Sequence, residues 1–322
     1  MTPLYPLRFR PLFRRYIWGG RKLATMLGKP IGDETCAESW EICDHGADQS
    51  IVAEGPLRET TLAELVGSCG SALFGRHAPQ PHFPLLFKFL DAREKLSVQV
   101  HPDDGRAALL TPPDLGKTEA WVVVAADPGS LIYAGLKRGF NRPALEREIQ
   151  RGTCELCLHS FTPRVGDCVF LPAGVVHAIG AGLVVAEIQQ SSDTTFRLFD
   201  WNRPGPDGKL RPLHVAQSLD AIDYAAGPVS PVAPQPTALP CVERLVACDK
   251  FILDRWDFAA AQTISSDNRF HILAVLAGSV SVAGDRADRP LVAGDTILLP
   301  ADRPPIELIP RPSAIMLDAY LP

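Results

Sequence analysis

The stretch Gly166-Asp-Cys-Val-Phe-Leu-Pro-Ala-Gly-Val-Val-His177 decides the organisation of this chain, because the chain contains a second copy of it. It aligns without a gap on Gly294-Asp-Thr-Ile-Leu-Leu-Pro-Ala-Asp-Arg-Pro-Pro305, with Gly, Asp, Leu, Pro and Ala at equal offsets. Each copy predicts a Gly-Asp turn, a four-residue apolar strand, a Pro-Ala turn and the start of another strand. Two copies of one β-motif imply two similar barrels. Since His177 is replaced by Pro305 in the second copy, a metal site built on this histidine would exist only in the first barrel.

Short apolar segments between turn residues surround both copies, which is typical of a sandwich or barrel. They predict strands at 96–101, 119–125, 168–171, 177–179, 183–189 and 195–199, and again at 251–256, 271–276, 280–282, 296–299 and 315–317. Helices are predicted only at 106–110 and at 141–150, the latter with Asn141 as a possible cap and Gly152 as its stop. The predicted fold class is therefore mainly β, with two barrels and a few short helices.

Proline is unusually frequent, at 30 of 322 residues, or about 9% against a usual value of roughly 5%. Five prolines fall in one segment and predict a linker: Pro228, Pro231, Pro234, Pro236 and Pro240. We therefore expect a domain at 1–227, a proline-rich linker at 228–240 and a C-terminal barrel without metal ligands at 241–322.

Composition excludes several classes of protein. With 46% hydrophobic and 21% charged residues the chain is globular, and a net charge of -5 provides no global positive field for nucleic acid or an anionic membrane. No stretch approaches the roughly 18 apolar residues of a membrane span. We expect a cytoplasmic monomer or small homo-oligomer with eight reduced cysteines. The single CxxC pair, Cys154 and Cys157, is interpreted as small apolar residues, because a zinc ribbon needs a second pair.

Four polar residues form a candidate metal site. Gln99 and His101 lie two apart in a predicted strand and therefore point to the same face. Glu119 opens the next strand, and His177 begins another one after a tight turn. Two imidazoles, a carboxylate and an amide oxygen suit Zn²⁺, with Fe²⁺, Mn²⁺ or Co²⁺ also possible.

The run from Gly166 to His177 resembles the second signature motif of the cupin superfamily, whose members are jelly-roll barrels with a metal-ligating histidine at this place. The match narrows because further motifs occur in the order of the class I mannose-6-phosphate isomerases, and the chain is most similar to their short bacterial form. These motifs are Lys95-Leu-Ser-Val-Gln-Val-His-Pro-Asp-Asp104, Gly116-Lys-Thr-Glu-Ala-Trp121, Pro172-Ala-Gly-Val-Val-His177 and the segment from Glu187 to Trp201. The resemblance covers residues 5–225 and extends more loosely to the C-terminal barrel, so both barrels are expected to be cupin-like jelly rolls.

The resemblance implies a set of site residues. One Zn²⁺ would be bound by Gln99, His101, Glu119 and His177. Arg197 and Lys117 correspond to functional residues of the family. Ser97 is expected near the substrate phosphate, and Arg203 is a weaker candidate for a phosphate contact. One departure concerns Gly116, which stands where larger members carry a histidine sometimes given a proton-transfer role, so this position cannot supply that role.

The implied reaction is the interconversion of mannose 6-phosphate and fructose 6-phosphate through a cis-enediol. Such a reaction needs a base of near-neutral pKa to move the proton, and Glu187, Asp193 and Lys117 are the candidates. The sequence does not rank them. Two alternatives stay open at this point: an Fe(II) oxygenase on the same barrel, and a non-catalytic module that binds sugar phosphates.

Overall fold

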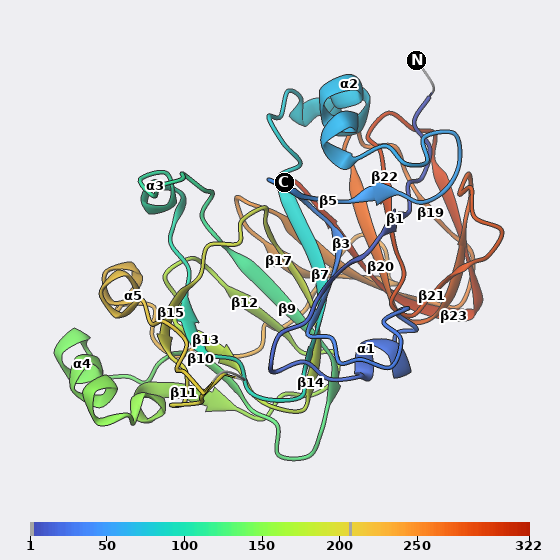
Figure 1. Ribbon diagram of the computed structural model, residues 1–322. Coiled ribbons are helices and arrows are strands. Elements are labelled where there is room, and N and C mark those ends of the chain that lie inside the picture. The colour runs from blue at the N-terminus through green and yellow to red at the C-terminus, as the bar shows by residue number, and fades with distance from the viewer. Residues whose placement is uncertain (1–2, 206–207) are drawn as a thin grey trace.

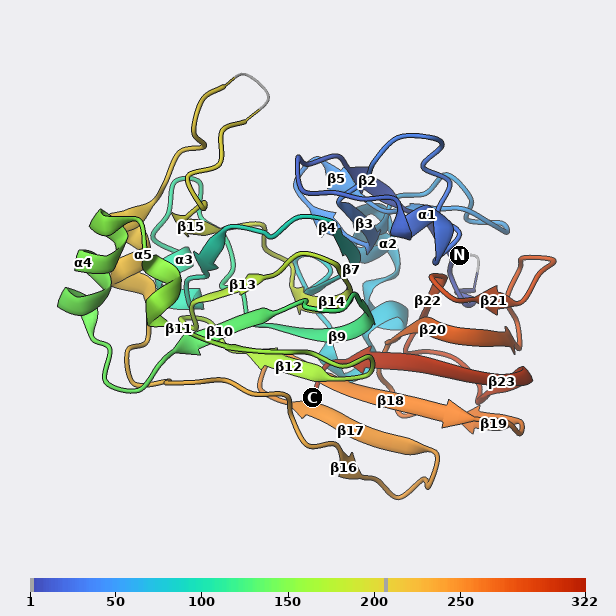
Figure 2. The same cartoon turned by 90° about the horizontal axis from the view of Figure 1, so that it is seen from below.

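The computed structural model describes residues 3–205 and 208–322 and is mainly β, as predicted (Figure 1). Strands of the first barrel occupy the left and centre of Figure 1, and those of the C-terminal sheet extend from the centre, at β17, to the right. Figure 2 shows the C-terminal sheet continuing beneath the first barrel, with the N-terminal strands on the opposite side. The fold of two β-barrels with few helices is thereby confirmed.

The first barrel is formed by two antiparallel sheets that pack face to face. The five-stranded sheet has the order β11 (Leu158–Phe161), β10 (Ile132–Leu136), β13 (His177–Ile179), β8 (Val98–Val100) and β15 (Phe196–Phe199). The six-stranded sheet has the order β12 (Cys168–Leu171), β9 (Glu119–Ala126), β14 (Leu183–Gln190), β7 (Leu85–Ala92), β3 (Glu38–Ile42) and β2 (Leu12–Arg14). Side chains of both sheets, such as Trp121 and Ile179, share one buried cluster.

The second barrel is built from one eight-stranded antiparallel sheet with its own apolar interior. Its strands are β16 (Gln235–Pro236), β17 (Val242–Ala247), β18 (Ile252–Phe258), β19 (Gln262–Ile264), β20 (His271–Val282), β21 (Leu291–Val292), β22 (Thr296–Leu299) and β23 (Ile306–Tyr320). The repeat has the same structure in both barrels. In each copy the predicted apolar strand, β12 or β22, has the predicted bounds and pairs antiparallel with a long central strand.

The helices lie outside the barrels: α1 (Lys22–Thr25), α2 (Leu62–Phe74), α3 (Asp104–Ala107), α4 (Arg142–Arg151) and α5 (Val215–Ala221). The cap of α4 is confirmed, because the Asn141 side chain accepts from the Ala144 amide and Gly152 ends the helix in a left-handed conformation. Helix α2, the longest, is absent from the sequence prediction. It begins with a capping box in which Thr61 and Glu64 satisfy each other's backbone amides.

The N-terminal segment links the two barrels. It contains the short strands β1 (Phe9–Arg10), β4 (Asp44–His45), β5 (Asp48–Gln49) and β6 (Ile51–Val52). Leu7 exchanges two backbone hydrogen bonds with Leu298, of 2.8 and 2.9 Å. The largest buried cluster contains residues from both parts of the chain, including Leu7 and Phe74 on one side and Phe270 on the other. The two barrels therefore share a continuous apolar core.

All eight cysteines are free thiols, and Cys154 and Cys157 are buried among apolar side chains, as the interpretation of the CxxC pair required. Among the described residues, no helix has both the length and the apolar character needed to cross a bilayer.

Candidate active site

Three strands of the first barrel, β8, β9 and β13, bring the predicted metal ligands together. His177 opens β13 and is the register partner of Gln99 in β8, while His101 follows β8 directly and Glu119 opens β9 in the facing sheet. Ligand atoms of His101, Glu119 and His177 all lie within 4.8 Å of one another. The distance from His177 Nε2 to Glu119 Oε1 is 3.2 Å, and that from His101 Nε2 to Glu119 Oε2 is 3.6 Å.

Backbone hydrogen bonds orient both imidazoles toward this centre. His101 Nδ1 lies 2.9 Å from the Thr194 carbonyl, and His177 Nδ1 lies 2.8 Å from the Val175 carbonyl. A carbonyl oxygen only accepts, so each Nδ1 carries the proton and each Nε2 presents its lone pair. Burial lowers the pKa of His177 to about 3 and that of His101 well below its usual range, with Lys117 adding to both effects. Both rings are therefore neutral at neutral pH, as metal ligands must be.

The donor set fits a metal cation. His177 Nε2 and Glu119 Oε1 are buried and have no hydrogen-bond partner among residues 3–205 and 208–322. Buried polar atoms without partners are rare in proteins, because each costs about 1–3 kcal/mol. The positive charge that these ligands contact is the Lys117 ammonium, which lies 3.1 Å from His101 Nε2 and in close contact with Glu119 Oε2. We conclude that His101, Glu119 and His177 form a site that could hold a metal.

A second cluster of buried charges adjoins the ligands. Glu187 in β14 lies 3.1 Å from Lys88 and 3.7 Å from Lys117, and its Oε2 accepts from the Trp121 indole at 2.7 Å. Burial raises the pKa of Glu187, but the two ammonium groups outweigh burial and lower it overall. For Lys88, burial lowers the pKa, and the carboxylates of Glu187 and Glu38 outweigh this effect and raise it. Glu187 is therefore an ionised carboxylate held in one position.

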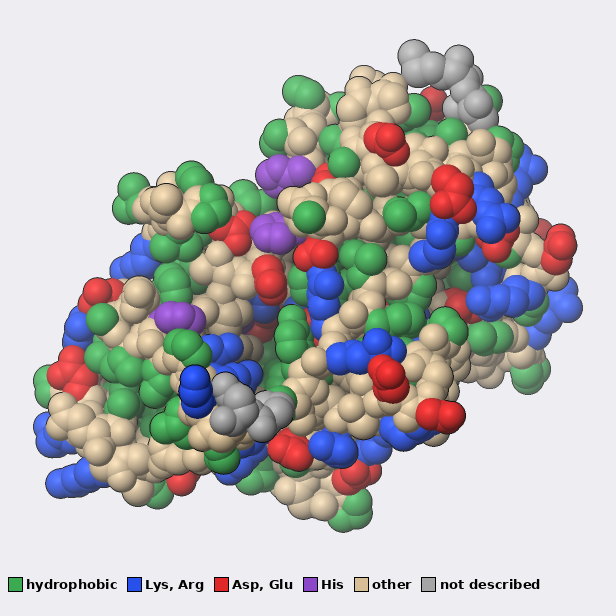
Figure 3. Space-filling model, in the orientation of Figure 1, with side chains coloured by type: hydrophobic (Ala, Val, Ile, Leu, Met, Phe, Trp, Pro, Cys, Tyr) green, Lys and Arg blue, Asp and Glu red, His purple; other side chains and the backbone are tan. Residues whose placement is uncertain are grey.

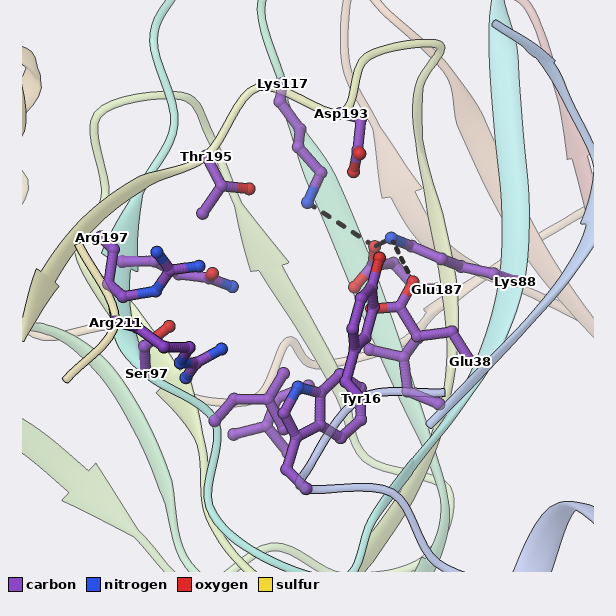
Figure 4. A pocket seen from close by; sticks show the side chains of 15 residues that line it. Tyr16, Glu38, Lys88, Ser97, Lys117, Glu187, Asp193, Thr195, Arg197 and Arg211 are labelled. Atoms are coloured by element: carbon purple, nitrogen blue, oxygen red, sulfur yellow. Dashed lines mark hydrogen bonds and ion pairs between the residues drawn. The ribbon is translucent and has the colours of Figure 1, made fainter. Parts of the chain in front are cut away.

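A cavity of about 280 Å³ connects these clusters to solvent. In Figure 4, Glu187, Lys88 and Glu38 lie at one end, and Arg197, Arg211 and Ser97 lie at the other. Lys117 and Asp193 project from the upper edge of this view. In Figure 3 the surface is hollowed between the left-hand part of the molecule and its centre, and Lys and Arg side chains gather there.

At the cationic end of the cavity, Asp200, which lies outside it, holds one of the two arginines. Arg211 makes two hydrogen bonds of 2.6 Å to Asp200. Arg197 donates to the Pro212 carbonyl at 2.9 Å, and its buried Nε has no partner among the described residues. Burial and the neighbouring Arg211 lower the pKa of Arg197. Two guanidinium groups with free hydrogen-bonding capacity form a site for an anionic group.

The predicted site residues thus fall into two groups. Nine of the ten either line this cavity or belong to the metal cluster beside it: Ser97, Gln99, His101, Lys117, Glu119, His177, Glu187, Asp193 and Arg197. Arg203 lies elsewhere, donating to Asp200 at 3.0 Å and to the Lys95 carbonyl at 2.9 Å.

Sequence reasoning missed several residues of the cavity, chiefly Glu38, Lys88 and Arg211. One signal for Lys88 was available, because it is a single charge within the apolar run Leu85-Leu-Phe-Lys-Phe-Leu90. A lysine at a fully buried strand position requires a carboxylate partner. Arg211 had no comparable signal, since it follows a turn and its approach to the cavity depends on the tertiary fold.

Comparisons with known proteins point to one family. The family model described as phosphomannose isomerase type I, catalytic domain, matches residues 7–119. The chain is 34% identical to mannose-6-phosphate isomerase ManA of Bacillus subtilis over 92% of this chain and 93% of that protein. It is also 34% identical to the mannose-6-phosphate isomerase of Streptococcus mutans over 92% of both chains.

The solved structures agree as well. A crystal structure of the mannose 6-phosphate isomerase from Bacillus subtilis superposes with a TM-score of 0.90 at 29% identity, covering 99% of this chain and 100% of that one. A structure of a mutant phosphomannose isomerase from Salmonella typhimurium, at 16% identity and a TM-score of 0.77, shares the fold over 99% of this chain and 100% of that one.

Proposed function

This chain belongs to the type I phosphomannose isomerase family, and on that premise we propose that the cavity beside His101, Glu119 and His177 is where it interconverts mannose 6-phosphate and fructose 6-phosphate. One observation carries the proposal. A single cavity has fixed carboxylates at one end and two arginines at the other, and the metal-ligating cluster adjoins it through Lys117. A sugar phosphate needs this arrangement, because its carbonyl and its phosphate lie at opposite ends of the molecule.

We propose that the metal is Zn²⁺, one per chain, and that Gln99 completes the ligand set. Gln99 supports this role by lining the cavity and pairing in register with His177. When bound, the metal supplies a Lewis acid that stabilises negative charge on the substrate oxygens. Mixed nitrogen and oxygen ligands suit zinc.

Arg197, Arg211 and Ser97 are proposed to bind the phosphate. The chain is acidic overall, so substrate binding depends on this local positive charge. The buried Nε of Arg197 has no partner within residues 3–205 and 208–322, and Arg211 is oriented by Asp200. Held at this end, the phosphate directs the C1 and C2 atoms of the sugar toward Glu187 and Lys117.

Asp193 is proposed to move the proton between C1 and C2. It lines the cavity and makes no hydrogen bond or ion pair with other described residues, so its carboxylate is available to the substrate. Glu187, by contrast, is held by Lys88 and by the Trp121 indole. We assign Glu187 to positioning the Lys117 ammonium, which can donate to a substrate oxygen as charge develops there.

A coupled isomerase assay tests this assignment. The wild type should convert mannose 6-phosphate without oxygen, lose activity with a chelator and regain it with Zn²⁺. Asp193→Asn should lower kcat by about 100-fold or more with little change in KM, because general-base catalysis contributes roughly 10²–10⁴-fold. Equal kcat values for Asp193→Asn and wild type would remove the proposed base, and sugar binding without turnover in zinc-loaded protein would remove the proposed activity.

The phosphate site has its own test. Arg211→Ala should raise KM for mannose 6-phosphate by about tenfold or more, because a hydrogen bond to a charged group is worth roughly 1.5–3 kcal/mol. Arg138→Ala, which removes an exposed arginine outside the cavity, is the matched control. An unchanged KM in Arg211→Ala would contradict the proposed phosphate contact.

The remaining proposals concern the whole protein. We propose a cytoplasmic location, supported by eight unpaired thiols, and a monomeric or small homo-oligomeric state. The substrate is the only partner that the cavity itself suggests.

A further inference from the structure

The second barrel carries charged residues at the strand positions that form the catalytic cluster in the first. The repeat provides the alignment, because Leu171 and Leu299 stand at the same offset in its two copies. In the first barrel Leu171 pairs with Glu119, and in the second Leu299 pairs with His271. His271 therefore occupies the position of a metal ligand.

Strand register extends the correspondence to two more positions. Glu187 pairs with the residue two after Glu119, and Asp318 pairs with the residue two after His271. On the next strand, Lys88 pairs with Glu187 and Asp254 pairs with Asp318. Thus Asp318 matches Glu187, and Asp254 matches Lys88.

His271, Asp318 and Asp254 are buried in the second barrel, and each makes hydrogen bonds there. His271 Nδ1 lies 2.8 Å from Asp318, and its Nε2 lies 3.2 Å from Asp267. Tyr320 donates to Asp254 at 2.7 Å. Among the described residues, only the first barrel has a cluster that could ligate a metal. The cluster in the second barrel is a set of hydrogen-bonded charged groups.

A cavity of about 340 Å³ opens over this cluster, at the end of the barrel where β20 begins. Trp256 lines it from β18, two residues from Asp254 and on the same face. Trp256 has a relative exposure of only 5%. Its indole Nε1 has no hydrogen-bond partner in the described part of the chain. A ligand that accepts a hydrogen bond would satisfy this group.

The charges of the cavity indicate the class of ligand. Three carboxylates, Asp254, Asp267 and Asp318, face two guanidinium groups, those of Arg244 and Arg269, and His271. Burial lowers the pKa of His271, but Asp318 and Asp267 outweigh burial and raise it to about 9. His271 is therefore positively charged at neutral pH. The three positive and three negative side chains of the cavity then sum to no net charge. Hydroxyl groups suit this lining, because each can donate a hydrogen bond to a carboxylate and accept one from a guanidinium. A single anion or cation would find groups of its own charge among its neighbours.

We propose that this cavity is a second binding site, which takes a neutral polyhydroxylated compound such as an unphosphorylated sugar or sugar alcohol. The site is separate from the isomerase cavity and does not depend on the function proposed for it. Because Trp256 is the unsatisfied donor, its indole nitrogen contributes directly to binding.

Saturation-transfer NMR on the full chain with D-mannitol as the probe tests the proposal. D-mannitol has neither phosphate nor carbonyl, and its binding should persist when mannose 6-phosphate saturates the isomerase cavity. Trp256→Phe should weaken binding by about fivefold, as expected for one lost hydrogen bond, while isomerase activity stays unchanged. Val292→Ala, an exposed position of the same barrel outside the cavity, is the control.

Three results would overturn the proposal: no mannitol binding, displacement of mannitol by mannose 6-phosphate, or equal affinities for Trp256→Phe and wild type. Inorganic phosphate is titrated in parallel, and binding of phosphate in place of mannitol would also contradict the neutral class of ligand. If Trp256→Phe fails to fold by circular dichroism, Tyr320→Phe, which removes one buried hydroxyl, is used instead and should also weaken binding.

Discussion

At the scale of single residues, His271 makes stability depend on pH. Its pKa is raised to about 9 in the folded protein, against roughly 6.5 when unfolded. The stabilisation is therefore complete below about pH 6.5 and is lost as pH rises through about 9. Urea unfolding should show wild type losing up to about 3 kcal/mol between pH 6.5 and 9.5. His271→Gln should lack this loss, and identical pH profiles for the two proteins would contradict the account.

Single residues also show where sequence reasoning stops. His101, Glu119 and His177 could be predicted as one cluster, because strand alternation suggested a shared face for Gln99 and His101 and the family resemblance implied the full set of ligands. The separation of Arg203 from the cavity and the entry of Arg211 into it could not be predicted, because both arginines donate to the same carboxylate, that of Asp200. Which of them reaches the cavity depends on the path of the loop and leaves no periodic pattern in the sequence.

At the scale of elements, the cap of α2 makes a measurable contribution. Thr61→Ala should lower the free energy of unfolding by about 1 kcal/mol, because it removes the side chain that accepts from the Glu64 amide. Glu64→Gln is the matched control, since glutamine also serves in a capping box. Urea unfolding measures both variants, and isomerase activity should stay unchanged because α2 does not line the cavity. Equal stability of Thr61→Ala and wild type would show that the cap is not stabilising.

Strands were predictable where turn residues and the ends of an apolar run marked the same boundaries. This was so for β12, β13 and β22, whose bounds are as predicted. Helix α2 was missed because Gly67 and Gly70 weaken its helical pattern, although the Thr61 and Glu64 spacing was a usable signal. Strand β20 was predicted as two strands. The prediction was wrong because Gly278, at φ +72°, allows the strand to continue through a change of register.

At the scale of the whole molecule, the shared core makes the two barrels interdependent. Phe270 and Leu298 pack in one cluster with Leu7 and Phe74, and the buried Lys29–Glu41 pair adds a hydrogen bond from Lys29 to the Gly294 carbonyl. The division into 1–227 and 241–322 remains a prediction about domains. We expect residues 241–322 alone to show no cooperative urea transition, because their half of this core would face water. A cooperative transition of that fragment would show that it folds independently.

The central claim is that this chain isomerises mannose 6-phosphate with a metal held by the first barrel, which has the one candidate metal cluster among the described residues. The most direct test measures metal content and coupled isomerase activity together in wild type, His177→Ala and Pro305→Ala. We expect about one bound metal and full activity in wild type and Pro305→Ala, and loss of both in His177→Ala. Full turnover by metal-free His177→Ala, or loss of the metal in Pro305→Ala, would contradict it.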